Sequence, residues 1–247
     1  MRTFGIIGYP LKQTFSPTYF GEKFSKEGID ARYLTYPLSS ITEFKGLLEQ
    51  HPYIAGLNVT IPYKEQVIPY LDELDSEAAK IGAVNVIKFT MEGDKLHLKG
   101  YNSDVKGFLD SLKPMMKSWH TKALILGTGG ASKAVAHALA REGILYRFVS
   151  RNPKSSAEVS YADLNPEIIS EYKLIINTTP LGMYPNSDSA PDIPYEGIGE
   201  KHLAYDVVYN PDTTLFLKKA QENGAQIKNG LDMLYLQAEE AWRIWNL

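Results

Sequence analysis

The stretch ALILGTGGASKAVAHALAREG, residues 123–143, decides the fold of this chain. Its first four residues form an apolar run typical of a buried strand, and Gly127, Gly129 and Gly130 follow directly before an alanine-rich helix. A glycine-rich turn between a strand and a helix suits a dinucleotide pyrophosphate, because glycine lets the backbone approach the ligand and the helix N-terminus offers free N–H groups. The stretch therefore predicts a Rossmann-type domain; the alternative is an ordinary glycine-rich turn.

The turn SRNPK, residues 150–154, follows the next predicted strand and bears on the choice of cofactor. In a standard NAD-binding domain an acidic residue stands about 20 residues after the glycine loop and binds the ribose 2′-hydroxyl. This chain has Arg151 at that place, and a guanidinium group binds phosphate oxygens bidentately. We therefore expect NADP rather than NAD, with Lys154 as a second cation; the alternative is a basic surface turn.

Composition excludes several classes of function. The net charge of −3 over 247 residues gives no electrostatic reason to expect nucleic acid as a partner. The chain has no cysteine, and its five histidines form no HxxxH or HExxH pattern, so we expect no disulfide and no metal site. No segment approaches the roughly 18 to 20 apolar residues of a membrane span. We therefore expect no membrane partner and a cytoplasmic location.

The organisation of the chain is that of an α/β protein, because predicted strands alternate with predicted helices. The pattern restarts near residue 102, which marks the expected domain boundary. We expect residues 1–101 to form an α/β substrate-binding domain and residues 102–229 to form the doubly wound Rossmann domain. A substrate domain beside a dinucleotide domain would place the active site in the cleft between them.

A second stretch, NVTIPYKE at residues 58–65, is the candidate for chemistry in the first domain. It is predicted to lead from a strand into a helix that begins at Pro62 and runs to about residue 74. A cation in the first turn of a helix is electrostatically unfavourable. Lys64 is therefore a candidate acid or base acting on a ligand, and Asp104 at the domain junction is the second; the alternative for Lys64 is a solvated surface lysine.

An ordered series of motifs runs through nearly the whole chain. It comprises QTFSP, NVTIPYKE, GAVN, the triplet Asn102–Ser103–Asp104, GTGGAS, SRN, NTTPLGM, YDVVYNP and NGLDMLYLQAEEAW. In kind and in order this series resembles the shikimate dehydrogenase family.

The resemblance implies reversible, NADPH-dependent reduction of 3-dehydroshikimate to shikimate in the chorismate and aromatic amino-acid pathway. Lys64 and Asp104 would be the catalytic acid–base pair. The implied substrate-binding residues are Thr14, Ser16, Asn58, Thr60, Asn85, Tyr209 and Gln237. The implied cofactor-binding residues are Gly127, Gly129, Gly130, Ala131, Ser150, Arg151, Thr178 and Gly230. The last helix, residues 230–247, would cross back and complete the first domain.

The chain departs from the family pattern at a few positions, and alternatives stay open. Thr14 and Ser103 exchange one hydroxyl residue for another, while Ser150 and Asn152 flank Arg151 in place of the usual asparagine and threonine. One rival is a quinate/shikimate dehydrogenase with relaxed cofactor use. The other is a non-catalytic ligand sensor, against which the retention of both candidate catalytic residues argues. The sequence leaves a monomer and a homodimer equally open.

Overall fold

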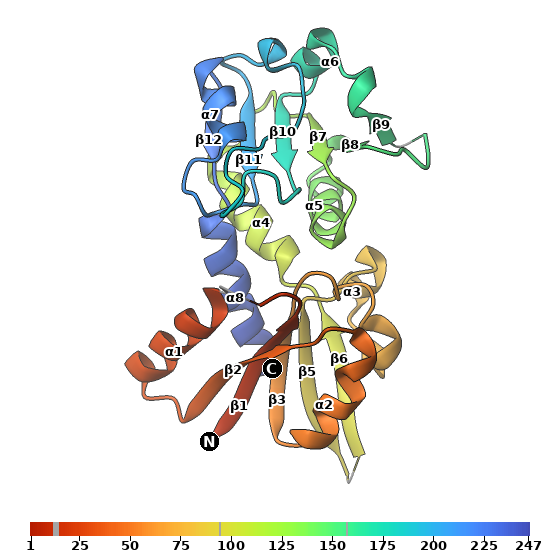
Figure 1. Ribbon diagram of the computed structural model, residues 1–247, viewed down its shortest axis with the longest axis vertical. Helices are drawn as coiled ribbons and strands as arrows, with labels where there is room; N and C mark the ends of the chain where they lie inside the picture. Colours follow the sequence, from red (N-terminus) through yellow and green to blue (C-terminus); the bar gives the residue numbers. More distant parts are fainter. Residues whose placement is uncertain (12–14, 94, 157) are drawn as a thin grey trace. The chain divides into compact units, whose positions relative to one another are not determined.

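The computed structural model describes residues 1–11, 15–93, 95–156 and 158–247, which divide into two units (Figure 1). Unit 1 comprises Met1–Ser103 and Ala238–Leu247, and unit 2 comprises Asp104–Gln237. The first boundary lies after Ser103, where the sequence suggests residue 101, and the second lies after Gln237, where it suggests residue 229. The first half of the last helix therefore belongs to unit 2. Among the described residues, no helix is long and apolar enough to cross a membrane.

Unit 1 is built on a mixed sheet. Its strands are β1 (Arg2–Gly8), β2 (Ala31–Pro37), β3 (Ile54–Val59), β4 (Glu73–Leu74), β5 (Val86–Glu92) and β6 (Lys95–Tyr101). Their order across the sheet is β2-β1-β3-β5-β6-β4. β1 lies parallel to β2 and β3, whereas β5 runs antiparallel to β3 and β6. β5 and β6 are consecutive along the chain and pair along their whole lengths.

Two hydrophobic clusters cover the opposite faces of this sheet, because successive side chains of a strand point to opposite sides. The helices of unit 1 are α1 (Phe15–Glu27), α2 (Phe44–Gln50), α3 (Ser76–Ile81) and the end of α8 (Leu231–Trp245). Phe4 and Tyr33 pack with α1 and the end of α8. Ile7 and Tyr36 pack with α2 on the other face (Figure 1).

The helix expected from Pro62 to about residue 74 is absent, and this prediction is wrong. The chain after β3 forms turns, the short 3-10 helix η2 (Ile68–Tyr70) and β4. The Lys64 carbonyl accepts a hydrogen bond of 2.7 Å from the Val84 N–H, which is a tertiary partner in place of a helical one. Pro69 also lacks the N–H that a continuing helix would need. Lys64 therefore does not stand at a helix N-terminus.

Unit 2 is built on a parallel sheet. Its strands are β7 (Lys122–Leu126), β8 (Leu145–Ser150), β9 (Glu158–Ser160), β10 (Leu174–Asn177), β11 (Leu203–Asp206) and β12 (Gln226–Lys228). The order β12-β11-β10-β7-β8-β9 is that of a doubly wound dinucleotide-binding sheet, and the reversal falls between β7 and β10. The helices are α4 (Asp104–Leu112), α5 (Gly130–Arg141), α6 (Pro166–Glu171), α7 (Leu215–Glu222) and the start of α8. The predicted Rossmann-type fold is confirmed.

Candidate functional site

The site in unit 1 is centred on two buried asparagines, Asn58 near the end of β3 and Asn85 just before β5. The Asn85 side chain and Ser103 bond reciprocally: Asn85 Nδ2 donates to Ser103 Oγ at 2.9 Å, and the Ser103 N–H donates to Asn85 Oδ1 at 2.7 Å. Asn58 Nδ2 donates to the backbone oxygen of Asn85 at 3.3 Å. Three polar residues far apart in sequence are thus joined in one buried network.

Tyr33 extends this network to helix α1. Its hydroxyl donates to Asn58 Oδ1 at 2.7 Å and lies close to the Ser16 side chain. Burial raises the pKa of Tyr33, so its hydroxyl keeps its proton. Ser16 lies inside α1 and is buried.

Thr60 and Lys64 stand on the turn that follows β3. The Thr60 N–H donates to the Ile7 carbonyl at 2.9 Å, which holds the turn against β1. The Lys64 carbonyl accepts from Val84, the residue before Asn85, and the lysine side chain is half-buried. The structure therefore brings the backbone of Lys64 next to the asparagine network.

Three further candidates belong to unit 2, and one lies outside the described residues. Asp104 is the first residue of α4 and is 4% exposed. Gln237 lies on α8, which approaches α4 closely, because a Cβ added at Gly107 would lie 2.9 Å from the Gln237 Cβ. Tyr209 follows β11 and is half-buried, and burial raises its pKa. Thr14 falls outside the described residues.

The glycine loop lies between β7 and α5. Gly127 has φ of 109°, a backbone conformation that glycine adopts readily and other residues rarely do. Gly129 is the N-cap of α5, and a Cβ added there would meet no atom within 4 Å. Gly130 and Ala131 open the helix, so their N–H groups are among those without intrahelical partners. The loop has the open space and the donors that a phosphate group requires.

Thr178 faces the glycine loop from the neighbouring strand. It follows β10, and its N–H and hydroxyl both donate to the Leu126 carbonyl, at 3.0 and 2.7 Å. A Cβ added at Gly127 would lie 2.9 Å from Thr178 Oγ1. These contacts occur where the strand order reverses, which is where doubly wound sheets bind their ligands.

Ser150 and Arg151 lie beside the loop, at the end of β8. The Gly127 N–H donates to the Val149 carbonyl at 2.9 Å, which ties the loop to this strand end. Ser150 Oγ accepts from the Asn152 N–H at 3.2 Å and shapes the turn. Arg151 is exposed. Burial raises the pKa of the nearby Tyr161, and the positive charge of Arg151 partly offsets this rise. The structure thus places a cation at the position predicted for a 2′-phosphate contact.

Gly230 stands where β11 and the start of α8 meet. Its N–H donates to the Val208 carbonyl at 3.1 Å, and a Cβ added to it would collide with the backbone of Val207. The glycine is therefore required for close packing of two backbone segments of unit 2.

One buried acid was not singled out from the sequence. Asp206 ends β11 and has no exposed surface. It accepts hydrogen bonds from Thr214 Oγ1 at 2.6 Å, from the Val208 N–H at 3.0 Å and from Asn177 Nδ2 at 3.0 Å. Burial raises its pKa to about 6 despite these donors. A polar residue at the end of an apolar strand was the available signal.

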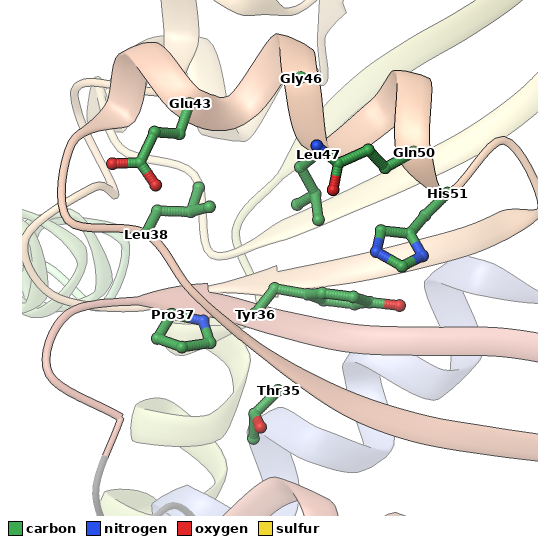
Figure 2. A pocket seen from close by; sticks show the side chains of 9 residues that line it. All are labelled: Thr35, Tyr36, Pro37, Leu38, Glu43, Gly46, Leu47, Gln50 and His51. Carbon is green, nitrogen blue, oxygen red and sulfur yellow. The ribbon is translucent and has the colours of Figure 1, made fainter.

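The groove between β2 and α2 is a different part of unit 1. It encloses about 430 Å³ (Figure 2). Its lining residues are Thr35, Tyr36, Pro37, Leu38, Glu43, Gly46, Leu47, Gln50 and His51. None of the predicted site residues is among them. In the described part of the chain, no cluster of His, Asp or Glu side chains could hold a metal ion.

Comparison with known proteins relates the sequence to one family. The family model for the shikimate dehydrogenase substrate binding domain matches residues 6–87. A shikimate dehydrogenase (NADP(+)) from Caldanaerobacter subterraneus subsp. tengcongensis is 38% identical over 262 residues, covering 99% of this chain and 91% of that protein. Its counterpart from Aquifex aeolicus is 37% identical, covering 98% of this chain and 90% of that protein.

Solved structures give the same relationship. The crystal structure of the Aquifex aeolicus shikimate dehydrogenase has a TM-score of 0.88 at 35% identity and covers 100% of this chain and 92% of that one. The Thermus thermophilus shikimate 5-dehydrogenase, in complex with NADP(H) and shikimate, has a TM-score of 0.87 at 31% identity, with 99% and 93% covered. The similarity thus includes the strands, turns and helices that carry the candidate residues of both units.

Proposed function

Because the chain belongs to the shikimate dehydrogenase family, a family of oxidoreductases, we propose that it catalyses the reversible NADPH-dependent reduction of 3-dehydroshikimate to shikimate. This reaction is a step of chorismate and aromatic amino-acid biosynthesis. The observation that carries the proposal is the 38% identity with a shikimate dehydrogenase (NADP(+)) over 99% of the chain. The buried amide network of unit 1 and the glycine loop of unit 2 support it.

The proposed substrate site uses side chains that bond hydroxyl and carboxylate groups. Asn58 and Asn85 belong to one connected network and Ser16 lies close to it, which supports their joint use on a substrate that carries several hydroxyl groups. We assign the carboxylate to Thr14 and Ser16. The residues assigned to the hydroxyl groups and to the orientation of the ring are Asn58, Thr60, Asn85, Tyr209 and Gln237.

The reaction transfers a hydride to a carbonyl carbon and a proton to its oxygen. The hydride is the chemistry that NADPH supplies when it is bound. We assign the proton to Lys64 and Asp104, acting as an acid–base pair at the carbonyl oxygen. In the direction of shikimate oxidation the same two residues accept the proton of the reacting hydroxyl. The hydrogen bond from the Val84 N–H to the Lys64 carbonyl holds Lys64 next to Asn85, which supports its place in this pair.

The proposed cofactor site follows the glycine loop. Open space at Gly129 and the N-terminal N–H groups of α5 fit a pyrophosphate. The residues assigned to the loop and the strand ends around it are Gly127, Gly129, Gly130, Ala131, Thr178 and Gly230. Ser150 and Arg151 are assigned to the adenosine side, where Arg151 would bind the 2′-phosphate of NADP.

Replacing Arg151 with alanine is expected to raise KM for NADPH by on the order of 10- to 100-fold, because a charge-assisted contact to phosphate is lost. KM for NADH should change much less, because NADH has no 2′-phosphate. Steady-state kinetics with both cofactors measure this. Arg141→Ala, at the end of α5, is the charge-matched control. Equal losses for NADPH and NADH would contradict the 2′-phosphate contact.

The proposed function is tested by assaying the purified protein with shikimate and with quinate, each against NADP and NAD. We expect the highest kcat/KM for shikimate with NADP. Turnover of quinate with NAD at a similar kcat/KM would instead identify a quinate/shikimate dehydrogenase. Binding of shikimate without any turnover would identify a ligand sensor, and absence of both binding and turnover would refute the proposal.

Two expectations from the sequence stay predictions. They are the cytoplasmic location and the choice between a monomer and a homodimer. Size-exclusion chromatography with light scattering on the purified chain would decide the second.

A further inference from the structure

We propose that Tyr33 is a positioning residue for the substrate, because its hydroxyl holds the Asn58 amide in place. This inference rests on the proposed function and deepens it. Tyr33 is not among the site residues that the family resemblance implies.

The Asn58 amide can be oriented in two ways, and its neighbours select one. Its Oδ1 accepts from Tyr33 at 2.7 Å, and its Nδ2 donates to the Asn85 carbonyl at 3.3 Å. Turning the amide by 180° would place Oδ1 against that carbonyl, where two acceptors would face each other. It would also place Nδ2 at the Tyr33 hydroxyl. The Asn85 carbonyl thereby selects which end of the amide is presented, and the Tyr33 hydroxyl holds the amide in that position. The second hydrogen of Nδ2 is the one we assign to a substrate hydroxyl.

The same hydroxyl lies close to the Ser16 side chain on α1. Ser16 and Phe20 lie four residues apart on α1 and so share one face of the helix. A single phenol therefore lies next to the two proposed substrate ligands, one on α1 and one on β3.

The Tyr33 ring is held firmly, so its hydroxyl has a defined position. The ring stacks on Phe20, with centroids 4.8 Å apart and planes at 12°, and it lies 6.3 Å from the Trp245 ring. Only 9% of the residue is exposed. Contacts to α1 and to the end of α8 therefore fix the ring, and removal of the hydroxyl alone should leave this packing in place.

Tyr36 provides a matched control on the same strand. It is 8% exposed and belongs to the cluster on the opposite face of the sheet. Its hydroxyl is buried and has no hydrogen-bond partner among the described residues. Figure 2 shows its ring extended below His51, and the two ring centroids are 5.0 Å apart. Tyr36→Phe removes a buried hydroxyl that positions nothing.

The test compares Tyr33→Phe with Tyr36→Phe in steady-state kinetics. For Tyr33→Phe we expect KM for shikimate to rise by on the order of 10-fold, because the Asn58 amide loses the hydrogen bond that holds it in place. Its kcat and its KM for NADP should stay within about 3-fold of wild type, and thermal unfolding should resemble that of Tyr36→Phe. Tyr36→Phe should keep all three kinetic constants. An unchanged KM for shikimate, or an equal rise in KM for NADP, would overturn the role of Tyr33.

A double-mutant cycle with Asn58→Ala adds a second criterion. If Tyr33 acts through Asn58, the two effects on KM for shikimate should combine to clearly less than their product. Fully multiplicative effects would overturn the connection between these residues. Wild-type protein in the same assay distinguishes failure of the Tyr33 role from failure of the proposed function. If the wild-type protein neither binds nor oxidises shikimate, the proposed function itself is refuted.

Discussion

Replacing Lys64 with alanine is expected to lower kcat for shikimate oxidation by at least about 10²-fold, because general acid–base groups contribute about that much. KM for shikimate should change little, since the asparagine network and Ser16 remain. The effect should appear in kcat and kcat/KM alike, which marks an interaction made in the transition state. Stopped-flow or steady-state measurement of NADPH formation provides both constants.

Two variants control for charge and for general loss of a lysine. Lys64→Arg keeps the positive charge but cannot give up a proton near neutral pH, so it should be as defective in kcat as the alanine variant. Recovery of kcat in Lys64→Arg would reduce the role of Lys64 to electrostatics. Lys45→Ala, an exposed lysine on α2, should behave as wild type. Near-normal kcat in Lys64→Ala would remove the residue from the mechanism.

Replacing Asp206 with alanine is expected to have the largest effect on stability. The change would leave the Asn177 amide, the Val208 N–H and the Thr214 hydroxyl without their acceptor inside unit 2. Buried donors without an acceptor cost about 1 to 3 kcal/mol each, so we expect a loss of at least about 3 kcal/mol in unfolding free energy. In a chain of this length that lowers Tm by roughly 10 °C. Differential scanning calorimetry measures the shift.

Asp206→Asn separates the hydrogen bonds from the charge. The amide oxygen can still accept from Val208 and Asn177, and the amide nitrogen can donate to the Thr214 oxygen. Its stability should therefore exceed that of the alanine variant. A Tm for Asp206→Ala equal to that of Asp206→Asn would contradict the role of these donors.

The pH dependence of the asparagine variant has a definite sign. Burial raises the pKa of Asp206 from 3.8 to about 6, so the protonated acid stabilises the fold below pH 3.8 and this contribution is lost as the pH rises through 6. A shift of this size corresponds to about 3 kcal/mol. The stability of Asp206→Asn relative to wild type should increase between about pH 4 and 6 and then level off. A constant difference would contradict the raised pKa.

The Rossmann-type unit could be predicted from the sequence because its signal is local. An apolar strand, three glycines and an alanine-rich helix occupy residues 123–143, and the structure has β7, the loop and α5 there. β9 and α6 were missed, because the strand has three residues and the helix six, too few to show a period. The cap of α6 was visible, since Asn165 precedes Pro166 and its side chain accepts from the Ile168 N–H.

The candidate site was predictable where a motif carries it and not where contacts across the sheet create it. NVTIPYKE and GAVN point to Asn58, Lys64 and Asn85, but nothing local connects them with residue 33. Tyr33 lies on β2 and Asn58 on β3, with β1 between them in the sheet. Their side chains meet across β1, on the face that α1 covers. The prediction of a helix from Pro62 was wrong for the same reason. The Lys64 carbonyl accepts a hydrogen bond from the distant Val84 N–H in place of a local helical one.

The assignment of Ala238–Leu247 to unit 1 also bears on the order in which the protein can fold during synthesis. Trp245 packs on Phe4 and donates through its indole nitrogen to the Ile87 carbonyl at 3.1 Å, so it closes the aromatic face of a sheet made much earlier. A ribosome translates all of Asp104–Gln237 before it reaches this residue. Throughout that interval Phe4 and Phe20 lack their contacts with Trp245. Vectorial translation therefore completes the residues of unit 2 before those of unit 1.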